Sequence, residues 1–178
     1  MKPLLRLGRR RSSWELQDAS AIADVEFRSG EGHDLTPSAY EVEARDAHEL
    51  RALTVQVCTE HAASFLGSPP TGVPPLDISG IDRPIATPGT TLFRYANSCH
   101  RELLFSNDAE LLRVVERIKS EITKRRVEDV TRSDMLGYAS ERLSTNDPEW
   151  VNATTAPQNA SAWVALIKKH QKKSGPSR

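Results

Sequence analysis

Two pairs of cysteine and histidine residues are the most reactive side chains of this sequence. Cys99 and His100 are neighbours in the stretch RYANSCHRELLF, and Cys58 and His61 are three residues apart. Residues three apart on a helix lie on the same side, so Cys58 and His61 could bind one ion there. The two sulfurs and two nitrogens together form a ligand set that zinc accepts.

The arrangement of these four residues nevertheless argues against a metal site. Zinc fingers and ribbons pair their ligands through short turns, and neither pair does so here. If Cys99 and His100 lie on a strand, their side chains point to opposite faces. His61 falls on an apolar helical stripe, which is typical of a hydrogen-bonded core histidine. We expect no metal, no other cofactor, and no nucleophile at Cys99, since basic residues near a thiol are common in any sequence.

Carboxylates offer a second possible chemistry. Glu41 and Glu43 are two residues apart on a predicted strand, so they share a face, and Asp34 precedes them in a turn. Such a group could hold a divalent ion for phosphodiester hydrolysis. The lysine that commonly follows the second acid of nucleases is absent, because no lysine occurs between Lys2 and Lys119. A solvated strand edge is the favoured interpretation, and a metal-dependent hydrolase or nuclease that uses these acids or a histidine is an alternative.

Other familiar catalytic motifs are missing. GEGHDL lacks the third glycine of a dinucleotide-binding loop, and no phosphate-binding loop ends in Gly-Lys-Ser or Gly-Lys-Thr. HELRA has an alanine where a zinc protease needs its second histidine, and no Gly-x-Ser-x-Gly elbow occurs.

The clearest positive signal is the stretch ASAWVALIKKHQKK near the C-terminus. At helical spacing its apolar side chains form one stripe, made of Trp163, Leu166, Ile167 and His170. The opposite half of this helix carries Lys168, Lys169, Lys172 and Lys173. Such lysines either interact favourably with the helix dipole and keep the protein in solution, or they bind phosphate groups. A second phosphate contact is expected from Arg9, Arg10 and Arg11.

The formal net charge of zero hides an uneven distribution. Residues 1–11 and residues 165–178 each carry five basic residues and no acid, of 24 basic and 24 acidic residues in all. The stretch between these ends contains the other 14 basic residues and all 24 acids, so its net charge is −10. An acidic body with basic ends indicates contact with nucleic acid or another acidic macromolecule. An inhibitor or immunity-type protein whose acidic body blocks a basic partner is a further alternative.

The length of 178 residues is that of one domain with extensions. We expect a basic N-terminal arm at 1–13, a single domain at 14–165 with a Pro/Gly-rich loop at 67–91, and a basic helix end and tail at 166–178. No apolar run is long enough for a membrane span. Two cysteines are too few for a disulfide framework, and we take a cytoplasmic location as the default.

Apolar patterning predicts strands at 21–28 and 38–44, a helix at 46–66, strands at 91–96 and 101–105, and helices at 108–126, 133–143 and 160–173. Asp46 and Glu49 have the spacing of a capping box. The first two strands are expected to pair as a hairpin. Trp14 and Trp150 lie at element boundaries, where we expect them to be partly buried.

These elements predict an α+β fold in which a small antiparallel sheet of about four strands is covered by three to four helices on one face. With no catalytic motif complete, we expect a small non-enzymatic binding protein that contacts nucleic acid or an acidic partner through its basic ends.

Overall fold

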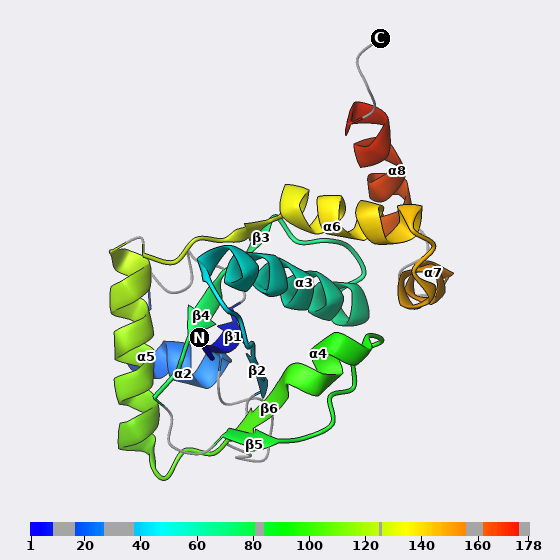
Figure 1. Cartoon of the computed structure of the whole chain (residues 1–178). Coiled ribbons are helices and arrows are strands. Elements are labelled where there is room, and N and C mark those ends of the chain that lie inside the picture. Colours follow the sequence, from blue (N-terminus) through cyan, green and yellow to red (C-terminus); the bar gives the residue numbers. More distant parts are fainter. Residues whose placement is uncertain (9–16, 27–37, 81–83, 125, 156–161, 175–178) are drawn as a thin grey trace.

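The computed structural model describes residues 1–8, 17–26, 38–80, 84–124, 126–155 and 162–174. Its centre is a five-stranded antiparallel sheet in the order β4-β1-β2-β6-β5 (Figure 1). The strands are β1 (Leu4–Leu7), β2 (Ser38–Glu41), β4 (Pro75–Asp77), β5 (Pro84–Ala86) and β6 (His100–Leu103). A second, two-stranded sheet joins β3 (Gly72–Val73) to β7 (Val130–Thr131). The predicted α+β class with an antiparallel sheet is confirmed, with one strand more than expected.

Both faces of the sheet are covered, whereas we expected helices on one face. Along β1, Leu5 and Leu7 belong to one apolar cluster and Leu4 to another. Successive side chains of a strand point to opposite faces, so these two clusters lie on opposite sides of the sheet. The first contains residues of α3 (Ala47–Phe65), α6 (Arg132–Ser144), α7 (Pro148–Thr155) and α8 (Ala162–Ser174). The second contains residues of α2 (Ala19–Glu26) and α5 (Asp108–Thr123).

Residues 4–7, within the segment 1–13 that we predicted as a basic N-terminal arm, form strand β1. β1 pairs with β2 on one side and with β4 on the other. Leu4, Leu5 and Leu7 are all buried, and burying them on both faces explains why this short segment joins the sheet. Arg9, Arg10 and Arg11, the expected second phosphate contact, lie outside the described residues, as does Trp14.

Two segments that we predicted as strands are helical. Residues 19–26 form α2. At the start of this helix, the Asp18 carboxylate accepts a hydrogen bond from Ala21 N at 2.8 Å. Residues 94–99 form α4 (Arg94–Cys99). Short apolar runs do not separate helix from strand by themselves, and here the packing of α2 against α5 decides. β2 therefore does not pair with residues 21–26, which are helical, and pairs with β1 and β6 instead.

The Pro/Gly-rich segment 67–91 is not a plain loop, because β3, β4 and β5 lie within it. β4 and β5 are the two edges of the sheet, and each begins with a proline, Pro75 and Pro84. Proline lacks a backbone N–H and is tolerated at the first residue of an edge strand.

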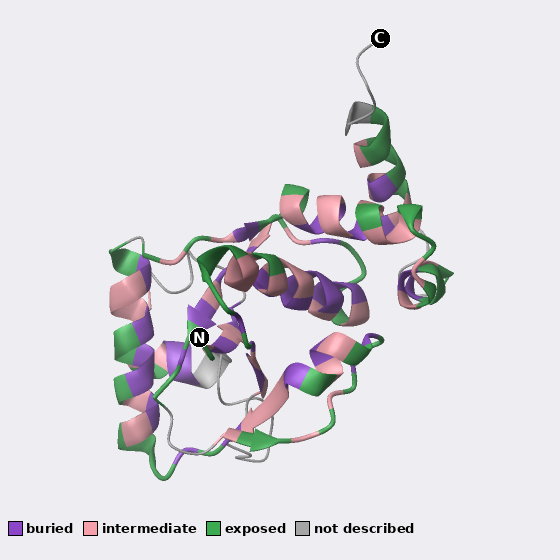
Figure 2. Cartoon of the chain, in the orientation of Figure 1, coloured by how far each residue is buried: buried purple, intermediate pink, exposed green. Residues whose placement is uncertain are grey.

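The longer helices agree with the predictions from periodicity and capping. Asp46 caps α3 by accepting from Glu49 N, and Asn107 caps α5 by accepting from Glu110 N. The apolar residues at helical spacing in α5, Leu111, Val115, Ile118 and Ile122, are buried, and Figure 2 shows this side of the helix facing the body while the outer side is exposed. The apolar stripe that contains His61 is not buried to the end of α3, since Phe65, four residues after His61, is exposed. Among the described helices, none has the length and apolarity to cross a membrane.

Candidate functional site

The lysine-rich helix α8 is docked on the body by the predicted apolar stripe. Trp163 and Ile167 are buried, and α8 packs against α6. The indole N–H of Trp163 donates to the backbone carbonyl of Leu66 at 3.3 Å, and its ring lies 6.3 Å from that of Trp150. Figure 1 shows that α8 extends outward from this contact toward the C-terminus. The helix is therefore anchored at its first turns and presents its later turns to solvent.

Lys168, Lys169 and Lys172 form the outer surface of α8, which we call the lysine face. All three are exposed, and within the described part of the chain none of them is in an ion pair. Lys173 belongs to the same helix, but its side chain lies outside the described residues. Residues 162–174 contain no acid that could neutralise these charges.

Several other surface cations of the molecule are paired with acids, whereas the three described residues of the lysine face are not. Lys2 lies 3.1 Å from Glu43, and Arg94 lies 3.2 Å from Glu149. Arg45, just before the capping residue of α3, binds Glu49 through its guanidinium at 2.9 Å. A charge that is paired within its own surface attracts an external anion less than an unpaired one.

The four cysteine and histidine candidates gather around one residue, Tyr40 of β2. The ring of Tyr40 meets His61 edge-on at 5.7 Å and His100 at 5.8 Å, and His100 is its direct partner on β6. Cys58 and Cys99 are buried in the same apolar cluster as Tyr40, and burial raises the pKa of Tyr40 well above its ordinary value. The structure therefore brings together two pairs that are about forty residues apart in the sequence.

The chemistry of this Tyr40 cluster is that of a packed core. Tyr40 Oη lies 2.7 Å from Nδ1 of His61, and burial lowers the pKa of His61 to about 4. Burial also raises the pKa of both thiols, Cys58 and Cys99, so that they stay protonated and unreactive. In the described part of the chain, no three His, Cys, Asp or Glu residues form a group that could hold a metal.

The two described carboxylates of the hydrolase alternative each lie beside a cation. Glu41 lies 3.5 Å from Arg101, and Glu43 lies 3.1 Å from Lys2. Asp34 lies outside the described residues. Each described acid is thus engaged by a cation of its own.

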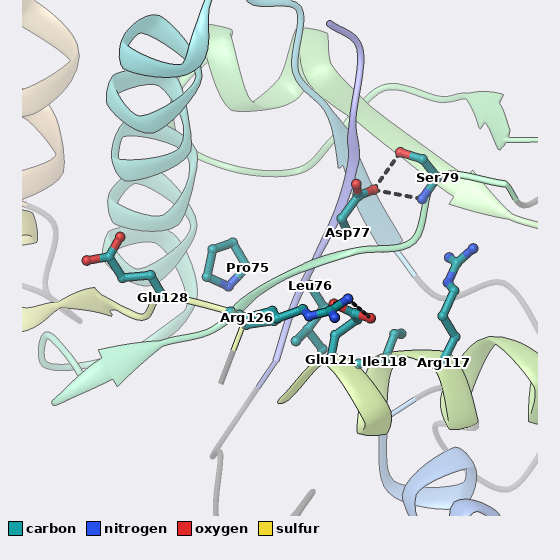
Figure 3. Close-up of a pocket in the computed structure, with 10 residues that line it drawn as sticks. Pro75, Leu76, Asp77, Ser79, Arg117, Ile118, Glu121, Arg126 and Glu128 are labelled. Carbon is teal, nitrogen blue, oxygen red and sulfur yellow. Dashed lines mark hydrogen bonds and ion pairs between the residues drawn. The ribbon is translucent and has the colours of Figure 1, made fainter. Parts of the chain in front are cut away.

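A cavity of about 390 Å³ between β4 and α5 carries charges of both signs (Figure 3). In its lining, Arg126 lies 3.4 Å from Glu121, and Asp77 accepts hydrogen bonds from Ser79. Because the lining contains both cations, Arg117 and Arg126, and acids, Asp77, Glu121 and Glu128, the cavity has no clear preference for a charged ligand.

Glu60 is a buried acid that the sequence reasoning missed. Only 2% of it is exposed, and its carboxylate accepts from Gln56 Nε2 at 2.8 Å, from Tyr138 Oη at 3.2 Å and from Ala96 N at 3.0 Å. Burial raises the pKa of Glu60 from 4.5 to about 7, although the hydrogen bonds act against this shift. Its position three residues after Val57, on the buried side of α3, was the signal that could have revealed it.

The described geometry thus contains a solvent-facing group of unpaired cations, the lysine face, together with the buried Tyr40 cluster and the buried acid Glu60. No protein-family model, curated protein or solved structure matches this chain.

Proposed function

We propose that this protein binds nucleic acid through the lysine face and does so without catalysing a reaction. The observation that carries the proposal is the exposure of Lys168, Lys169 and Lys172, unpaired within the described residues, on one anchored helix. Lysine ammonium groups bind phosphates as point charges and release the counterions that surround the nucleic acid.

The chemistry of this surface favours contact with the phosphate backbone over base recognition. Lysines position a protein on a duplex but carry little sequence information by themselves. The three residues described on this face would thus make the affinity insensitive to sequence and strongly dependent on salt. Arg9, Arg10 and Arg11 remain our proposed second contact.

The anchoring of α8 also supports the proposal. Trp163 is 1% exposed and Ile167 is equally buried, so the lysines are presented from a fixed position on α6. Binding then loses less conformational freedom than it would on a mobile tail. We further propose a cytoplasmic location, whose reducing conditions suit the two free thiols Cys58 and Cys99.

Fluorescence anisotropy with a labelled DNA duplex tests the proposal. The logarithm of the binding constant should fall linearly with the logarithm of the salt concentration. The triple variant Lys168→Gln, Lys169→Gln, Lys172→Gln should flatten that slope by about 2.7, since each phosphate contact contributes about 0.9. A duplex of unrelated sequence should give the same result.

The matched control removes three exposed cations from α5, at Arg113, Arg117 and Lys124. This control variant should retain most of the affinity and the slope. Equal losses in both variants, or an α8 variant that binds like the unmodified protein, would contradict the proposal. If polyglutamate binds the lysine face but DNA does not, the partner is an acidic protein and the nucleic-acid proposal is wrong.

A further inference from the structure

The edge strand β4 has backbone groups that the sheet does not use. Among the described strands, β4 pairs with β1 alone, and one bond of this pairing runs from Ile78 N to the Leu4 carbonyl at 2.8 Å. Alternate residues of an antiparallel strand bond its neighbour, so Leu76 faces β1 like Ile78, while Pro75 and Asp77 face away. Within the described chain, no hydrogen bond reaches the Asp77 N–H or the carbonyls of Pro75 and Asp77. Such an edge is a template for another strand.

The cavity of about 390 Å³ runs along this free edge (Figure 3). Successive side chains of a strand point to opposite faces, yet Pro75, Leu76 and Asp77 all line the cavity. The cavity therefore follows the edge of the sheet, with α5 as its other wall. From Pro75 to Ser79 the lining strand advances by four residues, which is about 13 Å. That is the length of a short extended peptide.

The charges of this lining are balanced in number but unevenly placed. Arg117 and Glu128 are exposed, and neither is in an ion pair within the described part of the chain. Nη1 of Arg117 lies at the end of β4, because it is 3.2 Å from the position that a Cβ on Gly80 would occupy. Figure 3 shows Glu128 on the far side of the cavity from Arg117. The end of the edge beside Gly80 is therefore its positive end.

We propose that the free edge of β4 binds the C-terminal end of an extended peptide, whose carboxylate pairs with the guanidinium of Arg117. Strand addition to a sheet edge is a general mode of peptide recognition, and its main-chain hydrogen bonds supply the affinity. A guanidinium suits the terminal carboxylate, because it can donate two parallel hydrogen bonds to it. The proposal is independent of the lysine face, which lies on α8.

The position of Arg117 fixes the direction of the peptide. The carboxylate end lies beside Gly80, beyond the end of β4, so the peptide runs parallel to β4. In a parallel pair, one residue bonds the two residues that flank the position opposite to it. When the middle residue of a tripeptide lies opposite Asp77, the first residue's carbonyl accepts from the Asp77 N–H and the third residue's N–H donates to the Asp77 carbonyl. The N–H of the middle residue points away from β4.

The probe is acetyl-Val-Thr-Val with a free carboxylate, titrated into the isotope-labelled full chain and followed by NMR. The backbone amide resonance of Asp77 should shift as the peptide binds. The same peptide with a C-terminal amide should bind at least about fivefold more weakly, because it lacks the charge. N-methylation of the third residue should also weaken binding at least about fivefold, since it removes a hydrogen bond. N-methylation of the middle residue is the matched control and should leave the affinity unchanged.

Variants of α5 examine the cation directly. Arg117→Gln should weaken the carboxylate peptide at least about fivefold and leave the amide peptide unchanged. Arg113 is also exposed and lies one helical turn earlier, outside the cavity lining, so Arg113→Gln is the control and should bind normally. The triple lysine variant of α8 should bind the peptide like the unmodified protein.

Several results would overturn the proposal. Absence of a shift at Asp77, equal binding of the amide peptide, unchanged affinity in Arg117→Gln, or loss of binding in the α8 variant would each do so. Greater sensitivity to N-methylation at the middle residue would mean an antiparallel peptide, which contradicts the pairing with Arg117. If the Asp77 resonance shifts with protein concentration alone, a second copy of the chain occupies the edge and the peptide proposal is wrong.

Discussion

Replacing the buried Glu60 by glutamine should change how the stability of this protein depends on pH. Glu60 joins three helices, because it lies on α3 and accepts hydrogen bonds from Ala96 N of α4 and the Tyr138 hydroxyl of α6. Burial raises its pKa from 4.5 to about 7. Glu60→Gln retains a polar side chain of nearly the same shape at this junction and removes the titration.

The sign of the effect follows from where the proton binds. Between pH 4.5 and 7 the carboxyl group of Glu60 is protonated in the folded chain and ionised in the unfolded chain. The folded state therefore binds more protons, and the free energy of unfolding falls as the pH rises through this window. One pKa unit corresponds to about 1.4 kcal/mol, so a pKa difference of about 2.5 units makes the ionised Glu60 unfavourable by about 3 kcal/mol above pH 7.

His61, the next residue of α3, opposes this trend in the unmodified protein. Its pKa is lowered from 6.5 to about 4, chiefly by burial and further by the charges of Arg6 and His100. The unfolded chain then binds more protons between these values, so the contribution of His61 to stability increases with pH. The two residues act in opposite directions over most of the same range. The raw pH dependence of the unmodified protein should thus be shallow and uninformative about either group.

Urea unfolding followed by circular dichroism should be measured for the unmodified protein and for Glu60→Gln at several pH values from below 4.5 to above 7. The stability of the variant relative to the unmodified protein should increase by about 3 kcal/mol across this range. The exposed Glu116→Gln is the control for loss of one negative charge. Tyr138→Phe removes a hydrogen bond that lowers the pKa of Glu60, so it should move the window to higher pH.

A constant difference between Glu60→Gln and the unmodified protein would refute the reasoning. It would mean that Glu60 titrates alike in the folded and unfolded chains, and hence that the carboxylate is not buried as described. A difference of the opposite sign would mean that the hydrogen bonds from Gln56, Ala96 and Tyr138 stabilise the ionised form more than burial opposes it.

Two further predictions follow from His61 and Trp163. His61→Gln removes a group whose stabilising effect grows from pH 4 to 6.5. In urea unfolding, the stability lost by this variant relative to the unmodified protein should therefore increase by about 3 kcal/mol over that range. A loss that does not vary with pH would contradict the lowered pKa of His61. Trp163→Ala leaves every lysine in place but removes the anchor of α8, and it should cost about 3–5 kcal/mol in thermal unfolding or undock the helix locally. Trypsin should then cleave at the lysine face faster than in the unmodified protein, and an unchanged cleavage rate would contradict the described docking.

The longer helices follow from local sequence signals. In α3 and α5 a capping residue, Asp46 or Asn107, precedes an apolar repeat at helical spacing, and both helices form where these signals predict them. The buried side of α8 was equally readable from Trp163 and Ile167. These interactions act between residues within about four positions of one another, so no knowledge of the rest of the chain is needed.

The strands were harder to predict because their partners are distant in the sequence. β1 pairs with β4, roughly seventy residues away, and the short apolar runs at 21–28 and 91–96 are compatible with either helix or strand. The pairing supplies most of the stabilisation of such short segments, and a local pattern does not contain it.

By itself the sequence determined the α+β class, the main helices and the solvent-facing lysines of α8. Only the tertiary structure decided the roles of the titratable residues. It gathered Cys58, His61, Cys99 and His100 around Tyr40 and buried Glu60 among three helices. The physical reason is that the reactivity and pKa of a side chain depend on its desolvation and on its neighbours, both of which arise when distant segments pack together.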